Sequence, residues 1–427
     1  MSDTDDTIWD VVVVGAGAAG LMAAIRAGER GKRVLLLEKN RRPGIKILMS
    51  GGTRCNITHD TDNRGIVQAY GHPGKFLYSA LAAFSVERTL QFFHDEGVAT
   101  KIEESGKIFP VSNKAADVLG ALLARIERIG VPLALAEPVL DIQRVEGRFA
   151  IVTPLRTLVA EKVILTTGGQ SFPGSGTTGD GYRFVQALGH SLIPLRPALV
   201  PITTHVLWVT ELRGITIPDT GVAILEGETR LIARRGSMLF AHFGLTGPVI
   251  LDVSRVVTGH ARPAALHLEF DFLPTMTDIK LEETIRDAAL ADGKKLLATT
   301  LPEPLPRRLI DPLFDAAGLP RDRKAAGLTK DDRQRLVRAI KRSRIAISGT
   351  MGFGKAEVTA GGVPLSEVHS SDMMSKLVPN LYLAGEVLDL DGPIGGYNFQ
   401  AAWSTGWLAG ESVSGSPQES AGLGPLR

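Results

Sequence analysis

The fold is decided by the stretch DVVVVGAGAAG, which occupies residues 10–20. Its first half, Asp10–Val14, is almost entirely apolar, which is typical of a strand covered on both faces of a sheet. Residues 18–30 are rich in Ala and Leu and predict a helix that stops at Gly31. Arg33–Leu37 predicts a second strand, and Glu38 follows it. This order of strand, glycine turn, helix and strand predicts a βαβ unit and an α/β fold.

The glycine turn has the spacing G-x-G-x-x-G. Gly15 permits the tight turn, Gly17 lets a pyrophosphate approach the backbone, and Gly20 lets the helix pack closely on the strand. The first amides of the helix then face the phosphates, while an acid at the end of the second strand accepts hydrogen bonds from a ribose. The sequence therefore predicts an adenine dinucleotide, held by Gly15, Gly17, Ala18, Ala19, Gly20, Glu38 and Lys39.

Two later apolar segments, Val163–Thr166 and Asn380–Ala384, resemble returns of the chain to the same sheet. The second runs into Glu386, which is placed to reach the ribityl hydroxyls or the pyrophosphate of a flavin. Further glycines precede a closing helix, whose N-terminal dipole favours the negative charge of reduced flavin. These features favour FAD, although ordinary strand–turn–helix corners are the alternative. The FAD-binding residues predicted here are Thr167, Gly168, Gly169, Gly385, Glu386, Gly392, Gly395 and Gly396.

Composition limits the class of protein. The 427 residues suggest two or three domains, and the 44% hydrophobic content with a mean hydropathy of +0.09 supports a large core. The single cysteine, Cys55, excludes an intrachain disulfide and a zinc site built from several thiolates, so no metal is expected. The acidic beginning and the short apolar runs predict a cytoplasmic protein without a membrane span.

Patterning along the chain predicts four segments. Residues 1–190 form the first part of the FAD-binding domain, and residues 191–275 form an inserted β-rich domain. Residues 276–344 form a basic helical domain, and residues 345–427 return to the β-rich and FAD-binding domains.

Several motifs together resemble one known family. They are KILMSGGTRCN (residues 46–56), KIFP (107–110), FAHFGLTGP (240–248), AGEVLD (384–389) and GGYNFQ (395–400). This set is similar to the BaiN/YhiN-type NAD(P)/FAD-dependent oxidoreductases, over nearly the whole chain. The resemblance implies non-covalent FAD, a Rossmann-like domain of the glutathione-reductase type, an inserted β-barrel-like domain and a small helical domain. One departure is Thr53, where the family usually has glycine.

The segment after the second strand is rich in hydrogen-bonding groups. Arg54 is expected to offset phosphate or reduced-flavin charge, and Asn56 to orient a flavin carbonyl. The remaining residues assigned to the cofactor site are Lys46, Ser50, Gly51, Gly52, Cys55, Val139, Tyr397, Asn398 and Phe399.

Three residues are catalytic candidates. His242 is expected on a strand of the inserted domain, where it can protonate a substrate carbon, or else be a buried structural histidine. Tyr397 is a second proton donor, or a residue that packs on the flavin ring. Cys55 invites a redox role, but one cysteine cannot form a catalytic dithiol, and a small packed residue beside the cofactor is the favoured interpretation.

We therefore expect an FAD-dependent oxidoreductase. NAD(P)H is the expected transient reductant, and hydride passes through flavin N5 to a C=C bond or a similar acceptor. The resemblance leaves other functions open, namely reduction of uridine in ribosomal RNA to dihydrouridine, and an amine-type oxidase that uses O₂. A further alternative is a flavin-stabilised RNA-binding factor without turnover. Substrate and oligomeric state stay open.

A basic block spans Lys294–Arg344, with 14 Lys/Arg against 6 Asp/Glu. Its last part, Asp331–Arg344, predicts a helix crowded with like charges, which repel each other at i,i+3 and i,i+4 spacing. Phosphates of ribosomal RNA would offset that repulsion, so RNA is a candidate partner beside a small-molecule substrate. A solvated helical face is the alternative.

Overall fold

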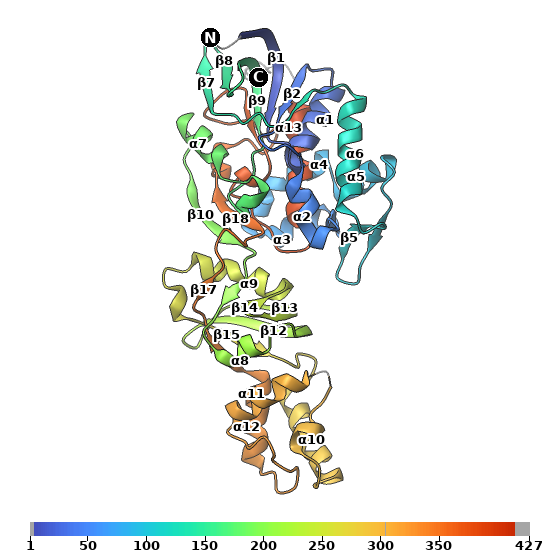
Figure 1. Cartoon of the computed structure of the whole chain (residues 1–427), viewed down its shortest axis with the longest axis vertical. Helices are drawn as coiled ribbons and strands as arrows, with labels where there is room; N and C mark the ends of the chain where they lie inside the picture. The colour runs from blue at the N-terminus through green and yellow to red at the C-terminus, as the bar shows by residue number, and fades with distance from the viewer. Residues whose placement is uncertain (1–3, 304, 415–427) are drawn as a thin grey trace, which may run out of the picture. The chain divides into compact units, whose positions relative to one another are not determined.

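The computed structural model describes residues 4–303 and 305–414, and these form two compact units (Figure 1). The first unit comprises Met1–Leu195 and Val358–Arg427, and the second comprises Arg196–Glu357. The chain leaves the first unit through β10 (Ile193–Ala198) and returns through β18 (Val358–Gly362). The predicted boundaries at residues 190, 275 and 344 remain a proposal.

The first unit is built on a sheet with the strand order β6-β2-β1-β9-β8-β7, and β19 also pairs with β9. Strands β1 (Thr4–Val14), β2 (Val34–Leu37), β6 (Leu133–Ala134), β9 (Thr157–Leu165) and β19 (Leu381–Leu383) run parallel. The hairpin of β7 (Asp141–Val145) and β8 (Arg148–Val152) is antiparallel to β9. The carboxyl ends of β1, β2, β9 and β19 therefore meet at one edge of the sheet, as in other parallel α/β folds. The predicted α/β class is confirmed.

Helix α1 (Ala18–Glu29) packs against α13 (Tyr397–Ser412), and Figure 1 shows both beside the parallel sheet. Glycines on α13 make this packing close, because a Cβ at Gly406 would lie 2.2 Å from the carbonyl oxygen of Ala19. The other elements of this unit are α2 (Ile45–Thr53), β3 (Thr58–His59), α3 (Asn63–Tyr70), α4 (Tyr78–Ala83), α5 (Val86–Asp95), β4 (Thr100–Ile102), β5 (Lys107–Pro110), α6 (Ala115–Arg128), α7 (Asp180–Ala187) and the 3-10 turns η1 (His72–Leu77), η2 (Pro173–Ser175), η5 (Leu365–Glu367) and η6 (Gly385–Val387).

The second unit has an antiparallel sheet in the order β16-β15-β12-β13-β14-β11-β17. Its strands are β11 (Ile202–Thr203), β12 (Thr216–Glu226), β13 (Thr229–Ala241), β14 (Gly244–Thr246), β15 (Leu266–Asp271), β16 (Ser343–Ala346) and β17 (Gly349–Thr350). The two edge strands, β16 and β17, are joined by Ile347 and Ser348, whose amides bond to Leu266 and Thr203. One short segment thus bridges both edges, which gives the sheet its barrel-like character. Helices α8 (Leu207–Glu211) and α9 (Pro248–Gly259) lie within the stretch predicted to be β-rich.

Helices α10 (Asp278–Ala291), α11 (Arg307–Ala317) and α12 (Lys330–Lys341) gather beyond this sheet in Figure 1. Leu336 and Ile340 of α12 share one buried cluster with Leu268 and Phe270 of β15, so strands and helices have a common core. Helix α12 ends earlier than predicted. Residues 343–346 alternate between buried and exposed and pair with β15, because a strand buries this part of the sequence better than another helical turn.

None of the helices in the described part of the chain combines the length and apolarity that a membrane crossing requires.

Candidate functional site

The glycine turn after β1 has two glycines that the protein's own packing requires and one that it does not. Gly15 has a φ of +102°, and a Cβ at Gly20 would lie 1.8 Å from the carbonyl oxygen of Gly15. At Gly17, by contrast, a Cβ would meet no described atom within 4 Å, and φ is −85°. Gly17 is also the N-cap of α1, where no described side chain caps the free amides. No described residue demands glycine at this position, so the open space and the uncapped amides suit a phosphate group.

Glu38 lies at the end of β2 and is buried. Its Oε2 accepts the backbone N–H of Ala16 at 2.9 Å, and its Oε1 accepts that of Asn40 at 2.8 Å. The carboxylate therefore fixes the glycine turn, and each oxygen keeps a lone pair for a further donor such as a ribose hydroxyl. The next residue, Lys39, pairs with Asp180 at 2.5 Å, and Val139 packs nearby against the apolar cluster that contains Leu37.

Glu386 connects four segments of the first unit. Its Oε2 accepts from Lys46 Nζ at 2.6 Å, while its Oε1 accepts from Ser171 Oγ at 2.9 Å and from the backbone N–H of Thr359 at 2.8 Å. Lys46 Nζ also donates to Ser171 Oγ at 2.8 Å. We call these four residues the Glu386 network. Sequence reasoning assigned Glu386 and Lys46 to the cofactor site but missed Ser171 and Thr359, which carry no recognisable motif.

Between residues 50 and 55 the backbone takes an uncommon course. Gly51, Gly52 and Thr53 have φ values of 56°, 67° and 69°, and they kink α2 after Ser50. Thr53 is a β-branched residue in the left-handed region, where glycine is favoured. The guanidinium of Arg54 lies 3.9 Å from the centre of the Phe109 ring and bonds to Glu103 at 2.6 Å. Arg54, expected to offset cofactor charge, therefore has an internal carboxylate partner.

Cys55 and Asn56 are both buried. Burial raises the pKa of the Cys55 thiol to about 12, against a smaller lowering effect of its hydrogen bond with Ser50. A neutral buried thiol is a poor nucleophile, so the structure favours the packing interpretation of Cys55. The Oδ1 of Asn56 has no hydrogen-bond partner within residues 4–303 and 305–414. Such an orphaned acceptor is costly unless a bound group donates to it.

The N-terminus of α13 is held close to β3. Gly396 has a φ of +95°, and a Cβ there would lie 2.5 Å from the carbonyl of Thr58. Tyr397 stacks on the ring of His59, with centroids 4.6 Å apart. His59 Nδ1 lies 3.0 Å from the carbonyl oxygen of Gly395, so this nitrogen is the one that donates. His59 was not anticipated, because no motif spacing marks it.

Asn398 and Phe399 stabilise the N-terminus of α13 through contacts inside the first unit. Asn398 Oδ1 accepts the N–H of Gly392 at 2.8 Å, and its Nδ2 donates to the carbonyl of Gly392 at 3.0 Å. The hydroxyl of Tyr70 donates to the carbonyl of Tyr397 at 3.1 Å, and burial raises the pKa of Tyr70 well above its ordinary range. Phe399 stacks on Trp403. Asn398 thus holds the loop before α13 rather than presenting a free amide.

The predicted cofactor-binding residues all lie in the first unit, whereas His242 lies in the second. His242 is exposed between β13 and β14, with its ring against Phe243. The buried structural role considered for it therefore does not apply. Thr167, Gly168 and Gly169 follow β9, and the Thr167 hydroxyl is buried without a partner in the described part of the chain.

These features fit a flavin dinucleotide. Helices α1 and α13 both have glycine as the N-cap residue, and no described side chain caps their first amides. Neither helix has an acidic residue in its first turn. The open space at Gly17 and the orphaned oxygen of Asn56 add a cradle and an acceptor. The comparison with protein families agrees, since the model described as the HI0933-like protein Rossmann domain matches residues 9–412. The chain belongs to this family.

Two relatives are similar to this chain over nearly its whole length. The ribosomal RNA dihydrouridine synthase of Escherichia coli (strain K12) is 33% identical, over 95% of this chain and 98% of that protein. The 3-dehydro-bile acid delta(4,6)-reductase of Clostridium scindens is 32% identical, over 95% of this chain and 99% of that protein. A solved 3-ketosteroid-delta4-(5alpha)-dehydrogenase from Rhodococcus jostii RHA1 has the same fold, with a TM-score of 0.51 and 16% identity over 96% of this chain and 98% of that chain.

The family match confirms the predicted relationship and the Rossmann-like domain. The protein is an FAD-dependent oxidoreductase of the HI0933-like family, as its sequence predicted.

Proposed function

We propose that this protein saturates a carbon–carbon double bond conjugated to a carbonyl group, and that the bond is C5=C6 of a uridine in ribosomal RNA. The names of the two relatives support this choice of chemistry. Dihydrouridine forms when this bond of uracil gains a hydride and a proton, and a delta(4,6) bile-acid reductase saturates double bonds in the same way. The same kind of flavin site can therefore reduce an RNA uridine or a bile acid. The choice between these two substrates must depend on other parts of the chain.

The first unit holds the cofactor in this proposal. FAD, when bound, supplies the hydride. The amides at the start of α1 bind its pyrophosphate, Glu38 binds the ribose, and Asn56 accepts a hydrogen bond from the flavin ring. The cofactor-binding residues that we propose are Gly15, Gly17, Ala18, Ala19, Gly20, Glu38, Lys39, Lys46, Ser50, Gly51, Gly52, Arg54, Cys55, Asn56, Val139, Thr167, Gly168, Gly169, Gly385, Glu386, Gly392, Gly395, Gly396, Tyr397, Asn398 and Phe399.

Tyr397 is the proposed proton donor. Its ring lies at the start of α13 and is held by stacking on His59, whose Nδ1 donates to the carbonyl of Gly395. His242 is the second candidate, from the other unit. Cys55 is a poor proton donor, because burial raises the pKa of its thiol to about 12 and the thiol keeps its proton at neutral pH.

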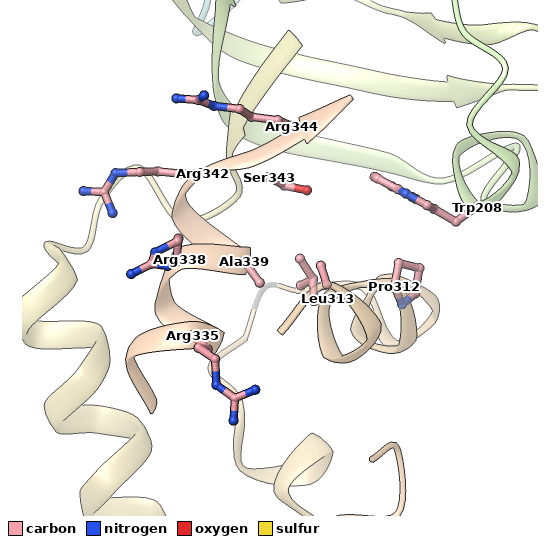
Figure 2. Close-up of a pocket in the computed structure, with 10 residues that line it drawn as sticks. Trp208, Pro312, Leu313, Arg335, Arg338, Ala339, Arg342, Ser343 and Arg344 are labelled. Atoms are coloured by element: carbon pink, nitrogen blue, oxygen red, sulfur yellow. The ribbon is translucent and has the colours of Figure 1, made fainter. Parts of the chain in front are cut away.

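The observation that favours RNA over a small apolar substrate is the charge of the second unit. Between Lys294 and Arg344 there are 14 Lys/Arg and 6 Asp/Glu. Acids outside this block pair with Arg342 and Arg344, but Lys330 and Arg338 are exposed and have no acidic partner among the described residues. Figure 2, a view of the cavity that these arginines line, shows the guanidinium groups of Arg338, Arg342 and Arg344 on the same side of α12 and β16. A steroid-like substrate gains nothing from this excess, whereas a phosphate backbone does. A ribosomal RNA substrate also supports a cytoplasmic location, with NADH or NADPH as the reductant.

The test is anaerobic reduction of the holoenzyme by NADH or NADPH, followed by a choice of oxidants. Ribosomal RNA that lacks dihydrouridine should reoxidise the flavin, and digestion with mass spectrometry should find one uridine that has gained two hydrogen atoms. A 3-oxo-4,6-diene steroid should reoxidise it at least tenfold more slowly. If only the steroid is reduced, the protein is a small-molecule reductase.

Two other outcomes would contradict the proposal. Rapid reoxidation by O₂ with peroxide release, and none by RNA, would indicate an oxidase. RNA binding without any flavin turnover would indicate a non-catalytic RNA-binding factor.

A further inference from the structure

His59 is enclosed by backbone on two sides. It ends β3 and pairs with Lys107 of β5, and its Nδ1 donates to the carbonyl oxygen of Gly395 at 3.0 Å. A Cβ at Gly395 would lie 3.3 Å from this nitrogen, and a Cβ at Gly106 would lie 2.7 Å from Nε2. Side chains at these two positions would crowd the ring. The two glycines therefore make room for the imidazole, and the backbone around them fixes its orientation.

The face of this imidazole lies against Tyr397. The ring centroids are 4.6 Å apart and the ring planes are inclined by 22°, which is a stacked arrangement. Tyr397 is the first residue of α13 and is half-buried. Long side chains in a helix normally lie over the turn that precedes them, and a residue at the helix start has no such turn. The stack on His59 therefore supplies support that the helix itself does not.

Other residues hold the backbone of Tyr397 rather than its ring. The hydroxyl of Tyr70 donates to the carbonyl of Tyr397 at 3.1 Å. Thr58 Oγ1 donates to Gln400 Oε1 at 2.7 Å, and both residues are buried, so β3 is joined to the first turn of α13. With the backbone fixed in this way, the orientation of the Tyr397 ring depends on its side-chain torsions, and His59 restricts them.

A proton donor depends on support of this kind. General acids act over about 2.6–3.2 Å between heavy atoms, and a displacement of about 1 Å can slow a reaction about a hundredfold. A tyrosine without neighbours would sample several staggered rotamers. Stacking against an imidazole that is itself fixed selects one of them.

We propose that His59 is a positioning residue, which holds the Tyr397 ring for delivery of a proton to the substrate. One carbon of the double bond gains a hydride from the reduced cofactor. The other carbon takes the proton of the Tyr397 hydroxyl, as a C–H bond forms and the O–H bond breaks, and the tyrosinate regains a proton from water. This inference rests on the proposed reduction with Tyr397 as the donor, and it adds a residue that acts on the reaction only through Tyr397.

The experiment uses FAD-loaded full-length protein, reduced anaerobically by NADH or NADPH and then mixed with ribosomal RNA that lacks dihydrouridine. His59→Asn removes the stacking face but keeps an amide that can donate to the Gly395 carbonyl. Reoxidation at saturating RNA should be at least tenfold slower, with KM changed less than twofold and with flavin content and flavin reduction unchanged. His59→Phe keeps a flat ring and should stay within threefold of the parent.

His94→Asn is the matched control. His94 is an exposed histidine on α5 of the same unit, and its ring bonds to Thr100 Oγ1 at 2.8 Å. This variant should reoxidise within twofold of the parent. Equal rates in His59→Asn and His94→Asn would overturn the inference. Loss of flavin from His59→Asn would also overturn it, because His59 would then act through the fold.

A double-mutant cycle separates positioning from a structural role. Tyr397→Phe keeps the stacking ring and removes the hydroxyl, so reoxidation should slow about a hundredfold, as expected for loss of a general acid. In this background, His59→Asn should cause less than a further twofold loss, since no hydroxyl is left to position. A further tenfold loss would show that His59 acts independently of Tyr397, which contradicts the inference.

Failure of the inference and failure of the proposed function give different results. If RNA does not reoxidise the parent, the proposed function fails, and the same cycle is measured with a 3-oxo-4,6-diene steroid, which needs a proton in the same step. If RNA reoxidises the parent and Tyr397→Phe at the same rate, uridine reduction stands and Tyr397 is not the donor. The inference on His59 then fails alone.

Discussion

The two units expose different kinds of polar groups. The first unit presents backbone groups behind glycine N-caps, and its buried carboxylates Glu38 and Glu386 hold loops in place. The second unit presents arginine side chains, most of them fixed by carboxylates from other strands and helices. A site built from backbone can be predicted from glycine spacing, whereas one built from side chains depends on partners that are distant in sequence.

The largest effect should come from Gly20→Ala in the backbone site. Its Cβ would lie 1.8 Å from the Gly15 carbonyl oxygen and 2.5 Å from Thr166 Oγ1. We expect a loss of about 3 kcal/mol or more in unfolding free energy, the upper range for overpacking. Urea unfolding of the apoprotein measures this effect. Gly120→Ala, on the open face of α6, is the control and should be neutral or slightly stabilising. Equal stability of both variants would contradict the assigned packing.

Glu386→Gln should have the next largest effect. It removes the negative charge of Glu386 and leaves Lys46 without its carboxylate partner. We expect the free energy of unfolding to fall by about 1.5–3 kcal/mol, the range for hydrogen bonds to a charged group. Flavin should dissociate more readily on dialysis. Glu411→Gln, which affects a more exposed pair with Arg26, should lose less than about 1 kcal/mol and retain its flavin. Unchanged flavin retention in Glu386→Gln would show that the network does not shape the site.

Thr53→Gly should stabilise the protein. Thr53 has a φ of 69°, and a left-handed residue costs about 1–2 kcal/mol unless it is glycine. The greater freedom of glycine in the unfolded chain offsets part of this gain, so we expect about 1 kcal/mol or less by urea unfolding. A loss of stability would mean that the Thr53 side chain contributes contacts that outweigh its backbone strain.

Cys55 should not react with thiol reagents in the native protein. With its pKa raised to about 12, the thiol is protonated at pH 8 and shielded from solvent. A maleimide should label it only after denaturation. Rapid labelling of the native protein at pH 8 would restore the redox interpretation of this residue.

Some features of the fold and site could be predicted from the sequence, and others could not. The apolar run before Gly15 predicted the parallel sheet, because local spacing determines it. The glycine spacing and Glu38 also predict where a dinucleotide binds, and this remains a prediction. Ser171, Thr359 and His59 could not be found, since they meet Glu386 and Tyr397 only after distant segments pack together. For the same reason, the charge pattern of Asp331–Arg344 overstated the free positive charge. The carboxylates that neutralise Arg342 and Arg344 lie 64 to 116 residues away in sequence.

The most direct test of the central claim, a backbone-lined FAD site at Gly17, is the flavin content of purified protein. The parent should carry close to one FAD per chain, and Gly120→Val, altered at an equally open glycine, should carry the same. Gly17→Val should fold as stably as the parent apoprotein and carry no flavin, because its side chain fills only the space meant for the pyrophosphate. A parent that cannot take up FAD, or a Gly17→Val variant with a full flavin spectrum, would contradict the account.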